Sequence, residues 1–89
     1  MTTKQKIRNI LKGHFTIQKL EIQDDSDLHA SHTEAKKRGG GHFSIFIVSS
    51  DFKNKTPLER HRMVYKALEE KLKSSIHALK IQAKTPEEN

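Results

Sequence analysis

The pattern of hydrophobic and polar positions predicts five regular elements, in the order helix, strand, strand, helix, strand. Apolar residues at helical spacing first predict a short amphipathic helix that Thr2 or Thr3 caps and that Gly13 ends. Alternation of apolar and polar residues from Thr16 to Gln23 then predicts a strand with one solvent-facing side. The segment from His42 to Ser49 has apolar groups on both faces, which is typical of a central strand.

The second half of the chain predicts a longer helix and a third strand. Thr56, Pro57 and Glu59 form a helix start, with the threonine as N-cap and the glutamate completing a capping box. The helix is predicted over 57–73, with a buried stripe made of Leu58, His61, Tyr65, Leu68 and Leu72. Alternation after Ser75 predicts a strand whose inner face has His77, Leu79, Ile81 and Ala83, and residues 85–89 are interpreted as a polar tail.

This order of elements predicts one two-layer α+β domain over residues 1–89. The first two strands pair antiparallel, and the helix between the second and third strands allows a right-handed crossover to a parallel neighbour. The result is a three-stranded mixed sheet with helices on one face. The segment 24–41 is rich in charge and glycine and lacks apolar periodicity. We interpret it as a long exposed loop, and loops of this length in small domains are usually functional.

Composition narrows the classes of function. The 89 residues include no cysteine, which excludes disulfides, a cysteine nucleophile and any cysteine-based zinc or iron–sulfur motif within the chain. No apolar run reaches the length of a membrane span and no secretory signal is apparent, so we expect a soluble, intracellular protein. Lysine and arginine outnumber aspartate and glutamate by 17 to 11, which favours association with nucleic acid or with an acidic partner.

The six histidines are the residues best suited to chemistry. His29 and His32 lie close together in the predicted loop, but no third ligand stands at the spacing of a zinc motif. His77 shares a strand face with apolar residues, which by itself favours a core histidine, and His42 and His61 are interpreted as structural. No nucleophile elbow or phosphate-binding glycine loop occurs. The sequence therefore predicts a binding protein rather than an enzyme.

Three segments of the second half together resemble the BolA family. They are the stretch TPLERHRMVYKAL at 56–68, IHAL at 76–79 and QAKTP at 82–86. The LEI at 20–22 and the GHF at 41–43 fit the first two strands of that family. The resemblance covers nearly the whole chain and implies the BolA fold, which is similar to the class II KH arrangement and agrees with the order of elements predicted above.

The resemblance also implies a function. BolA-like proteins are partners of monothiol glutaredoxins, with which they form heterodimers bridged by a 2Fe-2S cluster in iron–sulfur cluster trafficking and iron homeostasis. The C-terminal histidine ligand of the family matches His77, and the loop ligand matches His29, with His32 as a competitor. The glutaredoxin and glutathione supply the thiolates, so the isolated chain is expected to be a monomer without the cluster. We expect a bacterial-type cytoplasm rather than a mitochondrion.

The alternative function is that of a nucleic-acid-binding transcriptional regulator, because some BolA members are described in this way and the fold is KH-like. Asn54 stands where the family usually has glycine, and we expect the turn to persist because asparagine tolerates a left-handed backbone. The sequence does not decide whether the basic residues near this turn meet phosphates or an acidic glutaredoxin surface. The candidates for this surface are Lys53, Lys55, Arg60, Arg62 and Lys84.

Overall fold

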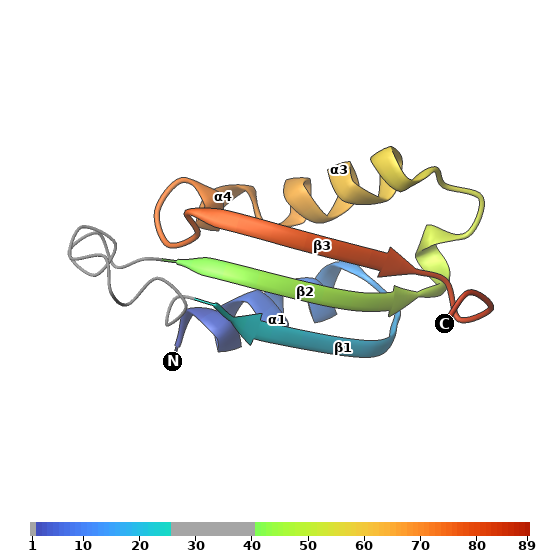
Figure 1. Ribbon diagram of the computed structural model, residues 1–89, viewed down its shortest axis with the longest axis horizontal. Helices are drawn as coiled ribbons and strands as arrows, with labels where there is room; N and C mark the ends of the chain where they lie inside the picture. Colours follow the sequence, from blue (N-terminus) through green and yellow to red (C-terminus); the bar gives the residue numbers. More distant parts are fainter. Residues whose placement is uncertain (1, 26–40) are drawn as a thin grey trace.

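The computed structural model describes residues 2–25 and 41–89. Its sheet consists of β1 (Ile17–Asp24), β2 (His42–Ser49) and β3 (Ala78–Lys84), in the spatial order β1-β2-β3. β1 pairs with β2 antiparallel, and β2 pairs with β3 parallel (Figure 1). The predicted α+β fold with a three-stranded mixed sheet is therefore confirmed.

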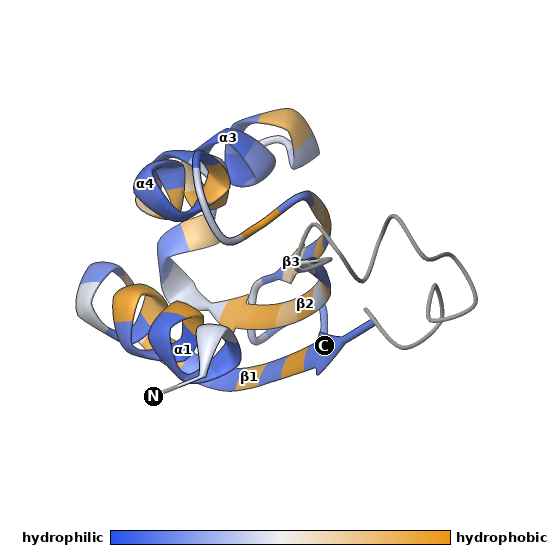
Figure 2. Cartoon of the chain, turned by 90° about the vertical axis from the view of Figure 1, so that its left-hand side faces the viewer, coloured by the Kyte–Doolittle hydropathy of each residue, from blue (hydrophilic) through white to orange (hydrophobic). Residues whose placement is uncertain are grey.

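The helices all lie on one face of the sheet (Figure 2). Phe43, Ile45 and Ile47 of the central strand are buried on that face, because alternate side chains of a strand point to opposite sides. His42 and Ser44, which alternate with them, lie on the other face and are half-buried. The buried residues on the helix side of the sheet form one hydrophobic core with Ile7, Leu11, Ile22, Phe52, Val64, Leu68 and Ile76.

The first helix, α1 (Thr3–His14), begins where the sequence predicts. The Thr2 hydroxyl accepts from the Gln5 N–H at 3.2 Å, and the Gln5 side chain accepts from the Thr2 N–H at 2.9 Å, which completes a capping box. The helix continues through Gly13 to His14, so the glycine does not end it as predicted. The two turns between these ends bury Ile7 and Leu11 completely against the sheet.

The helix predicted over 57–73 is two helices. α3 (Pro57–Ala67) starts at the predicted cap, where Thr56 and Glu59 complete a capping box. The helix is interrupted at Leu68, whose backbone has φ −100° and ψ 11°, and the short α4 (Glu69–Leu72) follows. Leu68 is fully buried, and its N–H is shared between the carbonyls of Val64 and Tyr65. Neither glycine nor proline marks this interruption, so the sequence does not indicate it.

The buried stripe of α3 also differs from the prediction. Val64 and Leu68 are fully buried, whereas Leu58 is 57% exposed and His61 is exposed. Leu68 is buried as predicted, and Tyr65 and Leu72 are half-buried, so the prediction is wrong only at Leu58 and His61. Arg60, not Leu58, brings the first turn of α3 against the end of β3. Within residues 2–25 and 41–89, no helix combines the length and apolar character needed to cross a bilayer.

Candidate functional site

Two histidines lie side by side at the end of the sheet where β1 ends and β2 begins. His42 is the first residue of β2, and His77 immediately precedes β3. Their ring centroids are 5.4 Å apart, with the ring planes inclined at 60°. His77 is exposed and His42 is half-buried. The parallel register brings these two imidazoles together although they are far apart in the sequence.

Gly41 fixes the backbone between the two histidines. Its carbonyl accepts hydrogen bonds from the His77 N–H at 2.7 Å and from the Ala78 N–H at 3.1 Å. A Cβ atom on Gly41 would lie 1.9 Å from the carbonyl oxygen of Ser75. Only glycine allows this approach of the two chain segments from which the two histidines project.

Asp25 ties the end of β1 to the same place. Its N–H donates to the His42 carbonyl at 2.7 Å, and its carboxylate accepts a hydrogen bond from the Ser44 hydroxyl. The backbone on both sides of the histidine pair is therefore held by hydrogen bonds. His29 and His32, the predicted loop ligands, lie outside the described residues, and their assignment stays a prediction.

The histidine pair offers two imidazole nitrogens as potential ligands. Imidazole is a ligand for zinc, copper and iron ions, and it replaces thiolate on one iron of some 2Fe-2S clusters. The described part of the chain has no group of three or more histidine, aspartate or glutamate side chains placed to hold a metal ion. The chain is free of cysteine. The donor set therefore fits a cluster whose remaining ligands come from another molecule.

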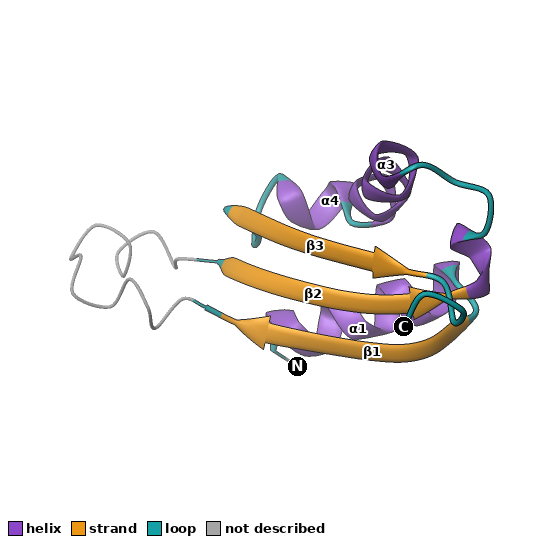
Figure 3. Cartoon of the chain, turned by 45° about the vertical axis from the view of Figure 1, so that its right-hand side comes forward, coloured by secondary structure: helices purple, strands orange, loops and turns teal. Residues whose placement is uncertain are grey.

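The predicted basic surface lies at the opposite end of the sheet from the histidine pair (Figure 3). Lys53 and Lys55 are exposed in the turn between β2 and α3, on either side of Asn54. Asn54 has φ 64°, which confirms that it takes the left-handed conformation expected of it. Arg62 is exposed on α3, and Lys84 is half-buried at the end of β3. The structure thus separates the predicted site residues into two groups.

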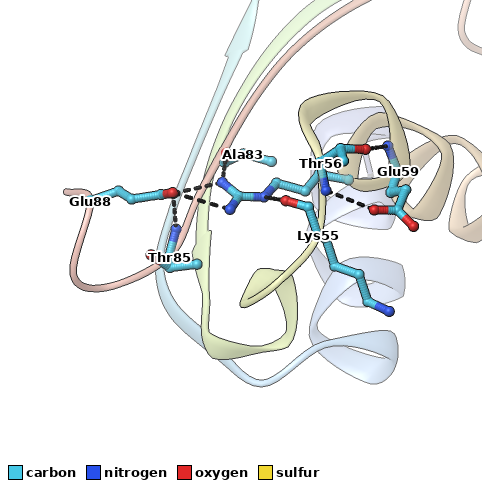
Figure 4. Close-up of polar contacts among 7 residues, drawn as sticks. Lys55, Thr56, Glu59, Ala83, Thr85 and Glu88 are labelled. Carbon is cyan, nitrogen blue, oxygen red and sulfur yellow. Dashed lines mark hydrogen bonds and ion pairs between the residues drawn. The ribbon is translucent and has the colours of Figure 1, made fainter.

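Arg60 differs from the other basic residues because its side chain is only 11% exposed. Its Nε–H donates to the Lys55 carbonyl at 3.0 Å, and one Nη donates to the Ala83 carbonyl at 3.1 Å (Figure 4). Both terminal nitrogens bind the Glu88 carboxylate, at 2.6 and 3.1 Å. Arg60 is therefore not the free surface cation that the sequence suggested, because its donors already have acceptors.

The C-terminal turn, residues 85–89, is more than a polar tail. Thr85 is 4% exposed, and its N–H donates to the Glu88 carboxylate at 2.9 Å. The hydrogen bond from Arg60 is the main cause that lowers the pKa of Glu88 to about 2, with the Thr85 N–H second. The same contact raises the pKa of Arg60 above its ordinary value. These paired charges hold the turn against the start of α3.

Comparison with known proteins identifies the family. The model of the family described as BolA-like protein matches residues 11–88. The chain belongs to the BolA family. A BolA relative in Haemophilus influenzae, named DNA-binding transcriptional regulator BolA, is 42% identical over 84 residues, which are 94% of this chain and 74% of that protein. The SufE-like protein 1, chloroplastic/mitochondrial, of Arabidopsis thaliana is 40% identical over 93% of this chain, but the match spans only 24% of that protein.

Solved BolA structures have the same fold. BolA1 from Arabidopsis thaliana superposes with a TM-score of 0.86 at 36% identity, covering 98% of this chain and 95% of that chain. The BolA domain of SufE1 from the same plant superposes with a TM-score of 0.85 at 39% identity, over 98% of this chain and 95% of that chain. These comparisons confirm the resemblance seen in the sequence, and they agree with the mixed sheet described above.

The sequence missed the proximity of His42 to the predicted BolA ligand His77. The sequence alone predicts a structural role for His42 at the start of a strand, and strand parity alone places His77 in the core. The core interpretation is wrong, because His77 is exposed. The predicted parallel pairing of the second and third strands could have indicated this proximity, because parallel strands begin at the same end of a sheet. The register, which pairs His42 with Ala78, is needed to place the two histidines side by side.

Proposed function

We propose that this BolA-family chain is a non-enzymatic partner that lends imidazole ligands to a 2Fe-2S cluster shared with a monothiol glutaredoxin. The exposed His77 beside His42, in a chain without cysteine, is the observation that supports the proposal most directly. A pair of imidazoles cannot complete the coordination of two irons, whereas thiolates of the glutaredoxin and glutathione supply what is missing. The protein would thereby take part in iron–sulfur cluster trafficking and iron homeostasis.

In this proposal His77 is the ligand held most firmly by the described chain. The hydrogen bond from its N–H to the Gly41 carbonyl fixes its backbone at the sheet end. His29 or His32 is the predicted second ligand, and His42 is a further imidazole already at 5.4 Å from His77 between ring centroids. A neutral imidazole binds iron through one ring nitrogen, so the residues of this chain act by presenting an unprotonated ring to the partner.

Cluster transfer tests the proposal. We would titrate the protein into a monothiol glutaredoxin that holds its cluster and glutathione, and follow visible absorption and circular dichroism. We expect a spectral change that saturates near one-to-one for the wild type and is lost for His77→Ala. His61→Ala is the matched control, because it removes an exposed imidazole from α3, away from the pair, and leaves the change intact.

The same titration distinguishes His29 and His32 from His42 as the second ligand. Loss of the spectral change in His29→Ala or His32→Ala identifies the loop ligand, and loss in His42→Ala assigns the second imidazole to β2. Absence of any change with the wild type, while the cluster of the glutaredoxin stays intact, would overturn the proposal.

Nucleic-acid binding is the second candidate, and a specific observation favours it. The exposed Lys53 and Lys55 flank the left-handed turn at Asn54, and Arg62 stands on the following helix. A relative 42% identical to this chain is named as a DNA-binding transcriptional regulator. Cations grouped in this way can contact phosphates and release counterions.

Salt-dependent binding of duplex DNA tests this second function. Each phosphate contact adds about 0.9 to the slope of log affinity against log salt concentration. We therefore expect Lys53→Gln and Lys55→Gln each to weaken binding and to lower that slope by about 1. The same variants leave cluster transfer unchanged, because they lie at the other end of the sheet. Equal slopes for wild type and both variants would exclude this surface.

A further inference from the structure

The side chain of Arg60 forms a pre-organised hydrogen-bond donor for a carboxylate. Two carbonyls from different segments orient it, that of Lys55 before α3 and that of Ala83 at the end of β3. Its outer edge then presents two nitrogens side by side, the arrangement that matches a carboxylate in bidentate fashion. Because the guanidinium is fixed on both sides by backbone, little freedom remains to be lost when an anion binds.

The chain itself supplies the carboxylate that occupies this place. Both oxygens of Glu88 face the fork of Arg60, and one of them also accepts from the Thr85 N–H at 2.9 Å (Figure 4). Three N–H groups thus converge on one carboxylate. The occupant is exposed, since the Glu88 side chain retains 44% of its accessible surface. A second carboxylate, that of Glu87, interacts electrostatically with Lys53.

The surroundings suit a peptide better than a bare anion. Beside the Arg60–Glu88 pair is an open hollow of about 330 Å³ whose lining includes the apolar side chains of Pro57, Ile81 and Ala83. The nearby Leu58 is 57% exposed, the only large hydrophobic residue so exposed in the described part of the chain. Residues 86–89 are all exposed, whereas Thr85 before them is buried.

From these contacts we propose that the Arg60 fork and the adjacent hollow form a docking site for an acidic peptide segment of a partner protein, which the C-terminal turn occupies in cis through Glu88. A glutamate or aspartate of the partner replaces Glu88 on the fork, and a neighbouring apolar side chain of the partner enters the hollow. The turn therefore competes with the partner, and the apparent affinity equals the intrinsic affinity multiplied by the fraction of molecules in which the fork is free.

Fluorescence anisotropy with the labelled peptide EELEE tests this site. We expect Glu88→Gln to bind the peptide on the order of tenfold more tightly than the wild type, because the internal competitor is lost. Glu70→Gln is the matched control, since it removes the same charge from an exposed residue of α4. The control leaves the affinity unchanged if the gain comes from the fork and not from the net charge.

Removal of the fork gives the complementary result. Arg60→Lys keeps the positive charge but cannot bind a carboxylate through two parallel N–H groups, so the double variant Glu88→Gln with Arg60→Lys loses the gain. Far-ultraviolet circular dichroism shows whether that variant folds, and shifts of the Thr85 and Glu88 amides on titrating the folded wild type report the exchange independently. The proposal is overturned if Glu70→Gln gains as much, if the gain survives Arg60→Lys, or if a DNA duplex shows the gain and the peptide does not.

Discussion

At the scale of single residues, Gly41 allows the chain before β2 to pass close to the segment before β3. Its absent side chain leaves room for the Ser75 carbonyl, which would be 1.9 Å from a Cβ. We predict that Gly41→Ala destabilises the fold by about 2 kcal/mol, the usual cost of forcing extra volume into a packed place. Urea unfolding measures this, with Gly13→Ala as control, because nothing lies within 4 Å of a Cβ built there. Equal stabilities of wild type and Gly41→Ala would contradict the tight approach.

The same residue shows why part of the site was hidden from the sequence. From the sequence, the glycine run at 39–41 indicates only a loop. The contact that requires glycine at position 41 is made with Ser75, which is far away in the sequence. His77 is predicted as a ligand only through the resemblance to the BolA family, because its alternation with apolar residues along the strand predicts a buried side chain. Asn54, by contrast, was predicted correctly, because the left-handed conformation depends on the residue itself.

At the scale of elements, local signals were reliable and long-range ones were not. The caps at Thr2 and Thr56 and the three strands were predicted within a residue or two, since they depend on neighbours in sequence. The interruption of the helix at Leu68 and the exposure of Leu58 and His61 depend on how the helix packs against the sheet. Propensity and periodicity contain no such information, so these two features could not be predicted.

The cap of α3 yields a prediction of its own. Thr56 accepts from the Glu59 N–H at 3.1 Å, and Glu59 returns the bond by accepting from the Thr56 N–H at 2.8 Å. We predict that Thr56→Ala lowers the free energy of unfolding by about 1 kcal/mol. Thr56→Ser keeps the hydroxyl and restores most of the stability. Chemical denaturation of the three proteins measures the difference, and equal midpoints for Thr56→Ala and the wild type would contradict the assigned cap.

At the scale of the whole molecule, the sheet separates two surfaces. The histidine pair lies where β2 and β3 begin, and the basic turn with the Arg60–Glu88 pair lies where they end (Figure 3). The sequence predicts the two groups as separate sites but not how far apart they lie, because a linear pattern shows proximity only within an element. The separation predicts that cluster transfer and anion binding are lost independently, each through its own variants.

The stability of the protein in acid tests the Arg60–Glu88 ion pair at the second surface. The pKa of Glu88 falls from its usual 4.5 to about 2 in the folded protein, chiefly through Arg60. The carboxylate thus binds fewer protons when folded than when unfolded, so its stabilising effect is complete above about pH 4.5 and is lost as the pH falls toward 2. We predict that the Tm of wild type exceeds that of Glu88→Gln at neutral pH and that the two converge in this acid range. A difference independent of pH would contradict the assignment.

The most direct test of the central claim is whether nitrogen from this chain touches the cluster. We would prepare the complex of this chain with a monothiol glutaredoxin, label only the histidines of this chain with nitrogen-15, and reduce the cluster chemically. Pulsed electron paramagnetic resonance then measures the hyperfine coupling of nitrogen to the cluster. The account predicts a coupling that changes with the label and that is weakened or lost in His77→Ala, because imidazole nitrogen replaces thiolate on one iron. A spectrum that is insensitive to the label would show that the chain binds the glutaredoxin without ligating its cluster.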